Sequence, residues 1–110
     1  MSLDFSLNSK QGGEEVEVLD KNITHNLNTM ADKAGIYNCL WRPDENNFKY
    51  AKDIIPILEK GSQDLKNRPE YFKQFNAKNG WGLFKHFVSW VEEVLQGCKD
   101  YPDAEIWVSR

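Results

Sequence analysis

The stretch that decides the fold is residues 84–109, FKHFVSWVEEVLQGCKDYPDAEIWVS. Its first part repeats apolar side chains at three- and four-residue spacing, which predicts an amphipathic helix. Gly97 and Pro102 mark the end of that helix, since neither residue favours its continuation. From Ala104 to Ser109 apolar and polar side chains alternate, which predicts a strand. The stretch therefore closes the chain with a helix followed by a strand.

The start of the chain predicts the strands that this closing strand can join. Apolar and polar residues alternate over residues 3–7 and again over residues 15–18, and Gly12-Gly13 lies between the two runs. Two alternating runs on either side of a Gly-Gly pair are typical of a β-hairpin.

After the hairpin the apolar pattern changes to a helical period. Apolar residues recur at three- and four-residue spacing from Asn22 to Gly35, which predicts a first helix that ends at the glycine. Either Asn22 or Thr24 can cap its start. Residues 36–41 predict a short second helical segment, which Pro43 stops.

Two further helices are predicted before the closing stretch. A cap at Asp53 starts one of them and puts Pro56 in its first turn, where a missing N–H does no harm. A short helix over residues 71–75 leads into the loop NAKNGWG, residues 76–82. Strands at both ends and about four helices between them indicate a single α+β domain, residues 1–110. Its helices cover one face of a small, mainly antiparallel sheet.

Composition limits the classes of partner. Fourteen basic residues face seventeen acidic ones, and this net charge of −3 opposes non-specific binding to a nucleic-acid backbone. No run approaches the roughly 18 apolar residues of a membrane helix, and no secretion signal opens the chain, so we expect a soluble, cytoplasmic protein. Cys39 and Cys98 lack the CxxC spacing and are expected to be free, buried thiols.

Enzyme motifs are missing from the sequence. It contains no G-x-S-x-G, H-E-x-x-H, Walker or G-x-G-x-x-G motif. Histidine is the usual general base of enzymes near neutral pH, but neither His25 nor His86 has a partner nearby in sequence that would give it this role. We therefore expect no catalytic residues, no metal site and no cofactor. A non-catalytic protein is favoured over a small hydrolase that uses one of the histidines.

Several aromatic residues lie where a core does not require them. Trp81 stands between two glycines of a polar loop, and it either folds inward as an anchor or stays exposed for stacking. Trp90 lies off the apolar stripe of the last helix, and Trp107 lies opposite the apolar face of the last strand. We expect both to offer area for a second layer or a partner, which allows a homo-oligomer.

A ligand-binding site is the hypothesis that these residues favour. For a nucleotide-like ligand, Trp41 or Trp81 would stack on the base and Arg42 would bind a phosphate. Asn26 and Asn79 would supply hydrogen bonds. The hypothesis requires these separate segments to converge in space.

Three segments together resemble a group of small, uncharacterised proteins encoded by bacteriophages and prophages. They are NITHNLNTMADKAGIYNCLWRPDE (residues 22–45), RPEYFKQFNAKNGWG (residues 68–82) and YPDAEIWVSR (residues 101–110). The resemblance implies an origin in a phage or prophage and a place in the cytoplasm of a bacterial host. It brings no established activity.

Such an origin implies an accessory protein that binds a host protein or a small ligand, in host takeover or counter-defence. A virion or assembly accessory protein is the alternative, and a small histidine-dependent hydrolase is less favoured.

Overall fold

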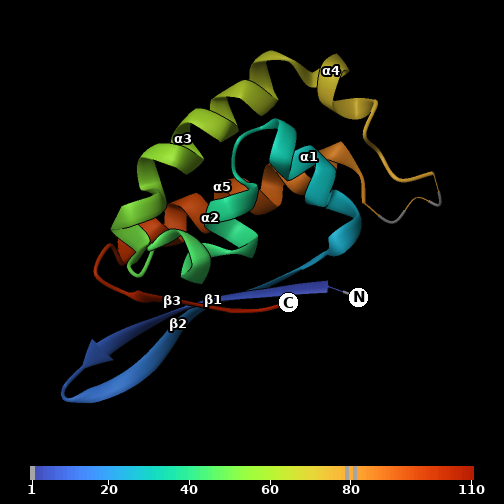
Figure 1. The fold of residues 1–110 in the computed structure, drawn as a ribbon. Helices are drawn as coiled ribbons and strands as arrows, with labels where there is room; N and C mark the ends of the chain where they lie inside the picture. Colours follow the sequence, from blue (N-terminus) through green and yellow to red (C-terminus); the bar gives the residue numbers. More distant parts are fainter. Residues whose placement is uncertain (1, 79, 81) are drawn as a thin grey trace.

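The chain folds into a three-stranded antiparallel sheet with helices packed on one face (Figure 1). The computed structural model describes residues 2–78, 80 and 82–110. Strands β1 (Ser2–Gln11) and β2 (Glu14–Thr24) form a hairpin, and β3 (Glu105–Ser109) pairs with the other side of β1. The strand order is β2-β1-β3. The predicted α+β fold, with the closing strand joined to an N-terminal hairpin, is confirmed.

The hairpin turns at the two glycines that the sequence indicated. Gly12 and Gly13 have φ angles of 59° and 85°, the left-handed region that a tight hairpin turn needs and glycine adopts without strain. The register shifts between Leu7 and Asn8, so β2 carries one extra residue at a bulge. The tip of the hairpin extends beyond the helices (Figure 1).

The helical segments lie between β2 and β3. Helices α3 and α5 are the two long ones, and they pack against each other above the sheet (Figure 1). In chain order the segments are η1 (His25–Leu27), α1 (Asn28–Lys33), α2 (Tyr37–Trp41), η2 (Pro43–Asn46), α3 (Ala51–Asn67), α4 (Pro69–Lys73) and α5 (Phe84–Asp100). Within the described residues no helix is both long and apolar enough to cross a membrane.

Of the two caps predicted for the first helix, Thr24 is confirmed and Asn22 is wrong. Residues 22–24 belong to β2, because Ile23 and Thr24 pair with the first residues of β1. The Thr24 hydroxyl then accepts the N–H of Asn26 at 3.2 Å and caps the short η1 turn. The end was predicted correctly: Gly35 has a φ of 76° and lies just after α1.

The start of α3 also differs from the prediction. The helix begins at Ala51, and Asp53 lies within its first turn. The Asp53 carboxylate accepts the N–H groups of Tyr50 at 3.0 Å and Lys49 at 3.1 Å, so it still caps the helix. Pro56 consequently lies in the second turn rather than the first.

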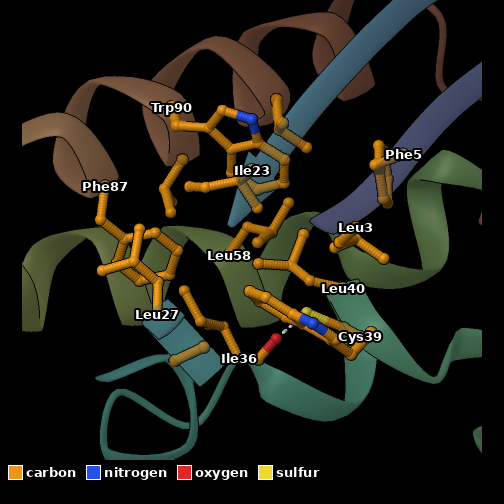
Figure 2. Close-up of a cluster of buried hydrophobic side chains, with 14 of the residues drawn as sticks. Leu3, Phe5, Ile23, Leu27, Ile36, Cys39, Leu40, Leu58, Phe87 and Trp90 are labelled. Atoms are coloured by element: carbon orange, nitrogen blue, oxygen red, sulfur yellow. Dashed lines mark hydrogen bonds between the residues drawn. The ribbon is translucent and has the colours of Figure 1, made fainter. Parts of the chain in front are cut away.

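One hydrophobic core joins the inner face of the sheet to the helices. Leu3, Phe5 and Leu7 of β1 are completely buried, and the inward residues of α3 and α5 pack above them. Figure 2 shows side chains from the strands, from α5 and from α2 meeting in this cluster. The Cys39 thiol lies within it and donates to the carbonyl oxygen of Ile36 at 3.3 Å (Figure 2).

Both cysteines are free and buried, as the sequence predicted. Removal from water raises the pKa of each thiol from 9.0 to about 12, and the nearby Cys98 contributes further to the rise at Cys39. Both thiols are therefore neutral in the folded chain near neutral pH.

We expect neither thiol to react with Ellman's reagent in the native protein at pH 8, and both to react in 6 M guanidinium. Because unfolded thiols ionise near pH 9.0 and folded ones near 12, stability should fall as the pH rises between these values. A spectrophotometric thiol count checks the first point. Rapid labelling of the native chain would show that one of the thiols is accessible.

Candidate functional site

A cleft of about 840 Å³ opens where β2 ends and α5 begins. It lies between the last residues of β2, the η1 turn, the glycines that precede α5 and the first half of α5. This volume falls in the range of about 300–1,000 Å³ typical of small-molecule sites. The lining residues are Ser2, Asn22, Ile23, Thr24, Asn26, Leu27, Gly80, Gly82, His86 and Trp90.

The floor of the cleft is apolar, and its largest side chain is fixed. Trp90 stacks on Phe87 with the rings 16° apart in angle and their centroids 6.4 Å apart, and it meets Phe5 edge-on at 6.3 Å. Its Nε1–H donates to the carbonyl oxygen of Asn22 at 3.1 Å. In Figure 2 the indole nitrogen is directed toward β2, above Ile23. The floor is therefore formed before any ligand arrives.

The expected exposure of Trp90 was wrong. Only 7% of the residue is exposed, because the indole covers the edge of β2. An edge strand has backbone groups without a neighbouring strand, and the indole N–H satisfies one of them. A helix period cannot reveal this contact, since it depends on where the strand runs.

The end of the hairpin, at Ser2, Asn22 and Thr24, forms one wall of the cleft. The amide of Asn22 donates to the Ser2 hydroxyl at 2.9 Å and to the Asp4 carboxylate at 2.6 Å. These two bonds hold the amide toward β1, on the face of the sheet away from the helices. The wall is therefore polar and uncharged.

Gly82, two residues before α5, approaches the η1 turn closely. A Cβ on Gly82 would lie 3.0 Å from the Cβ of Asn26, and Gly82 has a φ of 123°, so this position requires glycine. Its carbonyl oxygen accepts the N–H of Ala77 at 3.0 Å. The Asn76 side chain accepts the N–H of Phe84 at 2.7 Å and caps α5. The second wall is thus held by backbone contacts.

The cleft is almost without charge. Among its described lining residues there is no aspartate, glutamate, lysine or arginine, and His86 is the one histidine. An apolar floor between uncharged polar walls suits a planar, neutral ligand that offers hydrogen bonds. A phosphate group would find no cationic side chain among these residues.

Two residues of the predicted ligand set do not line the cleft, and the first is Trp41. This tryptophan is 2% exposed and stacks on Tyr37, with the rings 17° apart in angle and their centroids 5.6 Å apart. Its Nε1–H donates to Nδ1 of His25 at 2.9 Å. Since both faces of the indole are covered, Trp41 has no surface on which a base could stack.

Arg42 is the second predicted ligand-binding residue that does not line the cleft. Its Nε–H donates to the Tyr37 hydroxyl at 3.1 Å, and its guanidinium pairs with Glu45 at 2.6 Å. These two partners, Tyr37 foremost, raise the pKa of Arg42, so the side chain is charged and already bonded. Asn26 does line the cleft. The predictions for Asn79 and Trp81 fall outside the described residues.

The sequence interpretation missed the residues of β1 and β2 that form the first wall. His86 and Trp90 carried a usable signal, because residues four positions apart lie on the same face of a helix. Both lie beside the apolar stripe of α5, so together they mark a second face. Ser2, Asn22 and Thr24 gave no comparable signal, since their place depends on the pairing of two strands.

The histidines are not arranged as a catalytic pair. Nδ1 of His25 is occupied by Trp41. In the described part of the chain, no hydrogen bond or ion pair joins His86 to a carboxylate, thiol or hydroxyl. No group of three metal-ligating residues occurs among residues 2–78, 80 and 82–110.

Comparisons of the chain with protein-family models, with curated proteins and with solved structures found no match.

Proposed function

We propose that this chain is a non-catalytic binding protein whose cleft takes a small, neutral, planar ligand such as a nucleoside or nucleobase. One observation carries the proposal: a preformed tryptophan floor lies between walls of uncharged hydrogen-bonding groups. Flat heteroaromatic rings match such a site, because their faces are apolar and their edges carry donors and acceptors. The lack of a cationic side chain in the described lining favours a nucleoside over a nucleotide.

We further propose that the protein acts in the cytoplasm of a bacterial host, as a phage or prophage accessory factor in host takeover or counter-defence. The support is the resemblance of residues 22–45, 68–82 and 101–110 to small phage-encoded proteins. Capture of a small ligand fits such a role, because a binding protein can remove a signalling molecule without chemistry. A virion accessory role has less support, since of the two tryptophans expected to offer contact area Trp107 is exposed but Trp90 is buried within the chain.

Isothermal titration of the protein with nucleobases, nucleosides, nucleotides and cyclic nucleotides tests this function. We expect heat from at least one nucleoside or base and weaker binding of its phosphorylated forms. Replacement His86→Ala should weaken the best ligand about tenfold, the effect of one lost hydrogen bond. His86 is exposed, so the variant should keep the fold.

Lys85→Ala is the matched control, because Lys85 is the exposed neighbour of His86 on α5 and does not line the cleft. The affinity of Lys85→Ala for the best ligand should stay within twofold of the affinity of the unsubstituted chain. If no compound of the panel gave heat, the ligand proposal would be wrong. If His86→Ala and Lys85→Ala weakened the ligand equally, the binding site would lie elsewhere on α5.

A further inference from the structure

The outer face of the sheet is uncovered, and its position follows from the strand register. Side chains of β1 alternate between the two faces, and the completely buried Leu3, Phe5 and Leu7 mark the face that packs on the helices. Asp4 and Ser6 lie on the opposite face. Figure 1 shows the helices on one side of the sheet, so no helix covers this second face.

Three cross-strand rows of this outer face span all three strands, and toward the hairpin tip the face continues with the register pair Lys10–Glu15. Residues directly opposite each other in paired strands point to the same side, so the register gives each row in full. The rows, read from β2 through β1 to β3, are Asn22–Asp4–Ser109, Asp20–Ser6–Trp107 and Glu17–Asn8–Glu105. Trp107 thus lies beside Ser6, with acidic residues in its own row and in both neighbouring rows.

The carboxylates of these rows have no basic partner. Among the described residues, no lysine or arginine forms an ion pair with Asp4, Glu17, Asp20 or Glu105. Acids on the helical side are paired in most cases, as in Asp64–Arg68, Glu92–Lys66 and Lys21–Glu93. The unbalanced negative charge of the chain is therefore concentrated on the outer face of the sheet.

Trp107 gives this acidic face an apolar centre. It is 55% exposed, the largest exposed aromatic surface among the described residues. A tryptophan ring attracts a guanidinium or ammonium group placed over its face, and flanking carboxylates strengthen the same preference. Both features therefore select a cation that has an apolar or planar body.

We propose that the outer face of the sheet binds a basic segment of a partner protein, with an arginine side chain stacked on Trp107 and paired with Asp20 or Glu105. The charge of the face selects this occupant. A second copy of the chain would bring like charges together in a two-fold contact, and a nucleic acid would bring phosphates against the carboxylates. The proposal is independent of ligand binding in the cleft.

Nuclear magnetic resonance titration of the ¹⁵N-labelled chain with a nona-arginine peptide tests this surface. We expect shift changes at Ser6, Asp20 and the indole N–H of Trp107, and none at the indole N–H of Trp90, which is bonded within the chain. The affinity should fall as salt rises from 50 to 300 mM. Shift changes confined to the helical side would overturn the proposal.

Two variants and one control separate a specific surface from general attraction to an acidic protein. Trp107→Ala should weaken the peptide at least fivefold, and Glu17→Gln with Asp20→Asn should weaken it by a similar factor. Glu59→Gln with Glu92→Gln removes the same number of charges from the helical side and should change the affinity less than twofold.

If the two double charge variants lost the same peptide affinity, net charge alone would explain the binding. That result would overturn the proposal. An unchanged affinity of Trp107→Ala for the peptide would also overturn the proposal. Light scattering of the free chain at 200 µM should show a monomer. A dimer that Trp107→Ala abolishes would assign the face to a second copy instead.

Discussion

Replacement of Trp41 by alanine is expected to lower the free energy of unfolding by about 3–5 kcal/mol. The reason is the burial of the whole indole, 2% exposed and stacked on Tyr37. The substitution also leaves Nδ1 of His25 without the N–H that it accepts at 2.9 Å. Urea denaturation followed by circular dichroism measures the change, through the midpoint and slope of the transition.

Trp107→Ala is the natural control for this measurement. The same side chain is removed, but Trp107 is 55% exposed and leaves little cavity, so a loss within about 1 kcal/mol is expected. If Trp41 were instead a ligand-stacking residue, Trp41→Ala would change stability as little as Trp107→Ala does and would abolish ligand binding. Those two results together would show that Trp41 belongs to the ligand-binding site, as the sequence predicted.

Trp41 also shows what separates a predictable element from an unpredictable contact. The sequence indicated a short helical segment over residues 36–41 ending before Pro43, and α2 (Tyr37–Trp41) confirms it. Local spacing decides such a segment. Whether its last side chain faces water depends on Tyr37 and on His25, which lies sixteen positions earlier in the chain. No periodicity within α2 carries that information.

The hairpin, α5 and β3 were predictable for the same local reason. Strict alternation, a Gly-Gly pair and a 3.6-residue stripe each occupy one continuous stretch of sequence. The error at Asn22 arose where two local patterns compete. Ile23 and Leu27 fit a helical face, but pairing of Ile23 with Leu3 extends β2 and removes the residue from the helix. Tertiary pairing prevailed over local spacing there.

The candidate cleft was predictable only in part. Asn26 and His86 drew attention as polar residues beside apolar helical stripes, and both line it. The first wall depends on the register of Ser2 against Thr24, which is set by hydrogen bonds along the whole hairpin. The acidic outer face of the sheet depends on the same register. Single-strand alternation assigns each residue to a face but cannot place the strands side by side.

Gly61→Val is expected to lower the free energy of unfolding by about 3 kcal/mol, and Gly61→Ala by about 1–2 kcal/mol. Gly61 lies in α3 where the chain before α2 approaches it. A Cβ there would lie 2.3 Å from Cγ2 of Ile36 and 3.2 Å from the carbonyl oxygen of Ala34. Ile36 is completely buried, so its methyl group has no free space to enter. Gly61 follows Leu58 by three residues and precedes Leu65 by four, a spacing that puts it on the inner stripe of the helix but cannot show what faces it.

Gly97→Ala isolates the effect of that contact. Gly97 also lies inside a helix of 17 residues, so both alanines gain the same helix propensity, about 1 kcal/mol. Its added Cβ would meet the Cδ2 of Leu19 at 2.9 Å, but Leu19 is only partly buried and its side chain can move aside. Gly97→Ala should therefore be neutral or slightly stabilising in urea denaturation.

The difference between the two alanine variants cancels the propensity and measures the cost of separating α3 from residues 34–36. A value of about 2 kcal/mol is expected. Equal stability of the two variants would mean that the segment yields to a methyl group, and that the close approach at Gly61 does not hold α2 in place. Because the loss expected for Trp41→Ala rests on burial of the indole and on its bond to His25, that prediction stands apart from the result at Gly61.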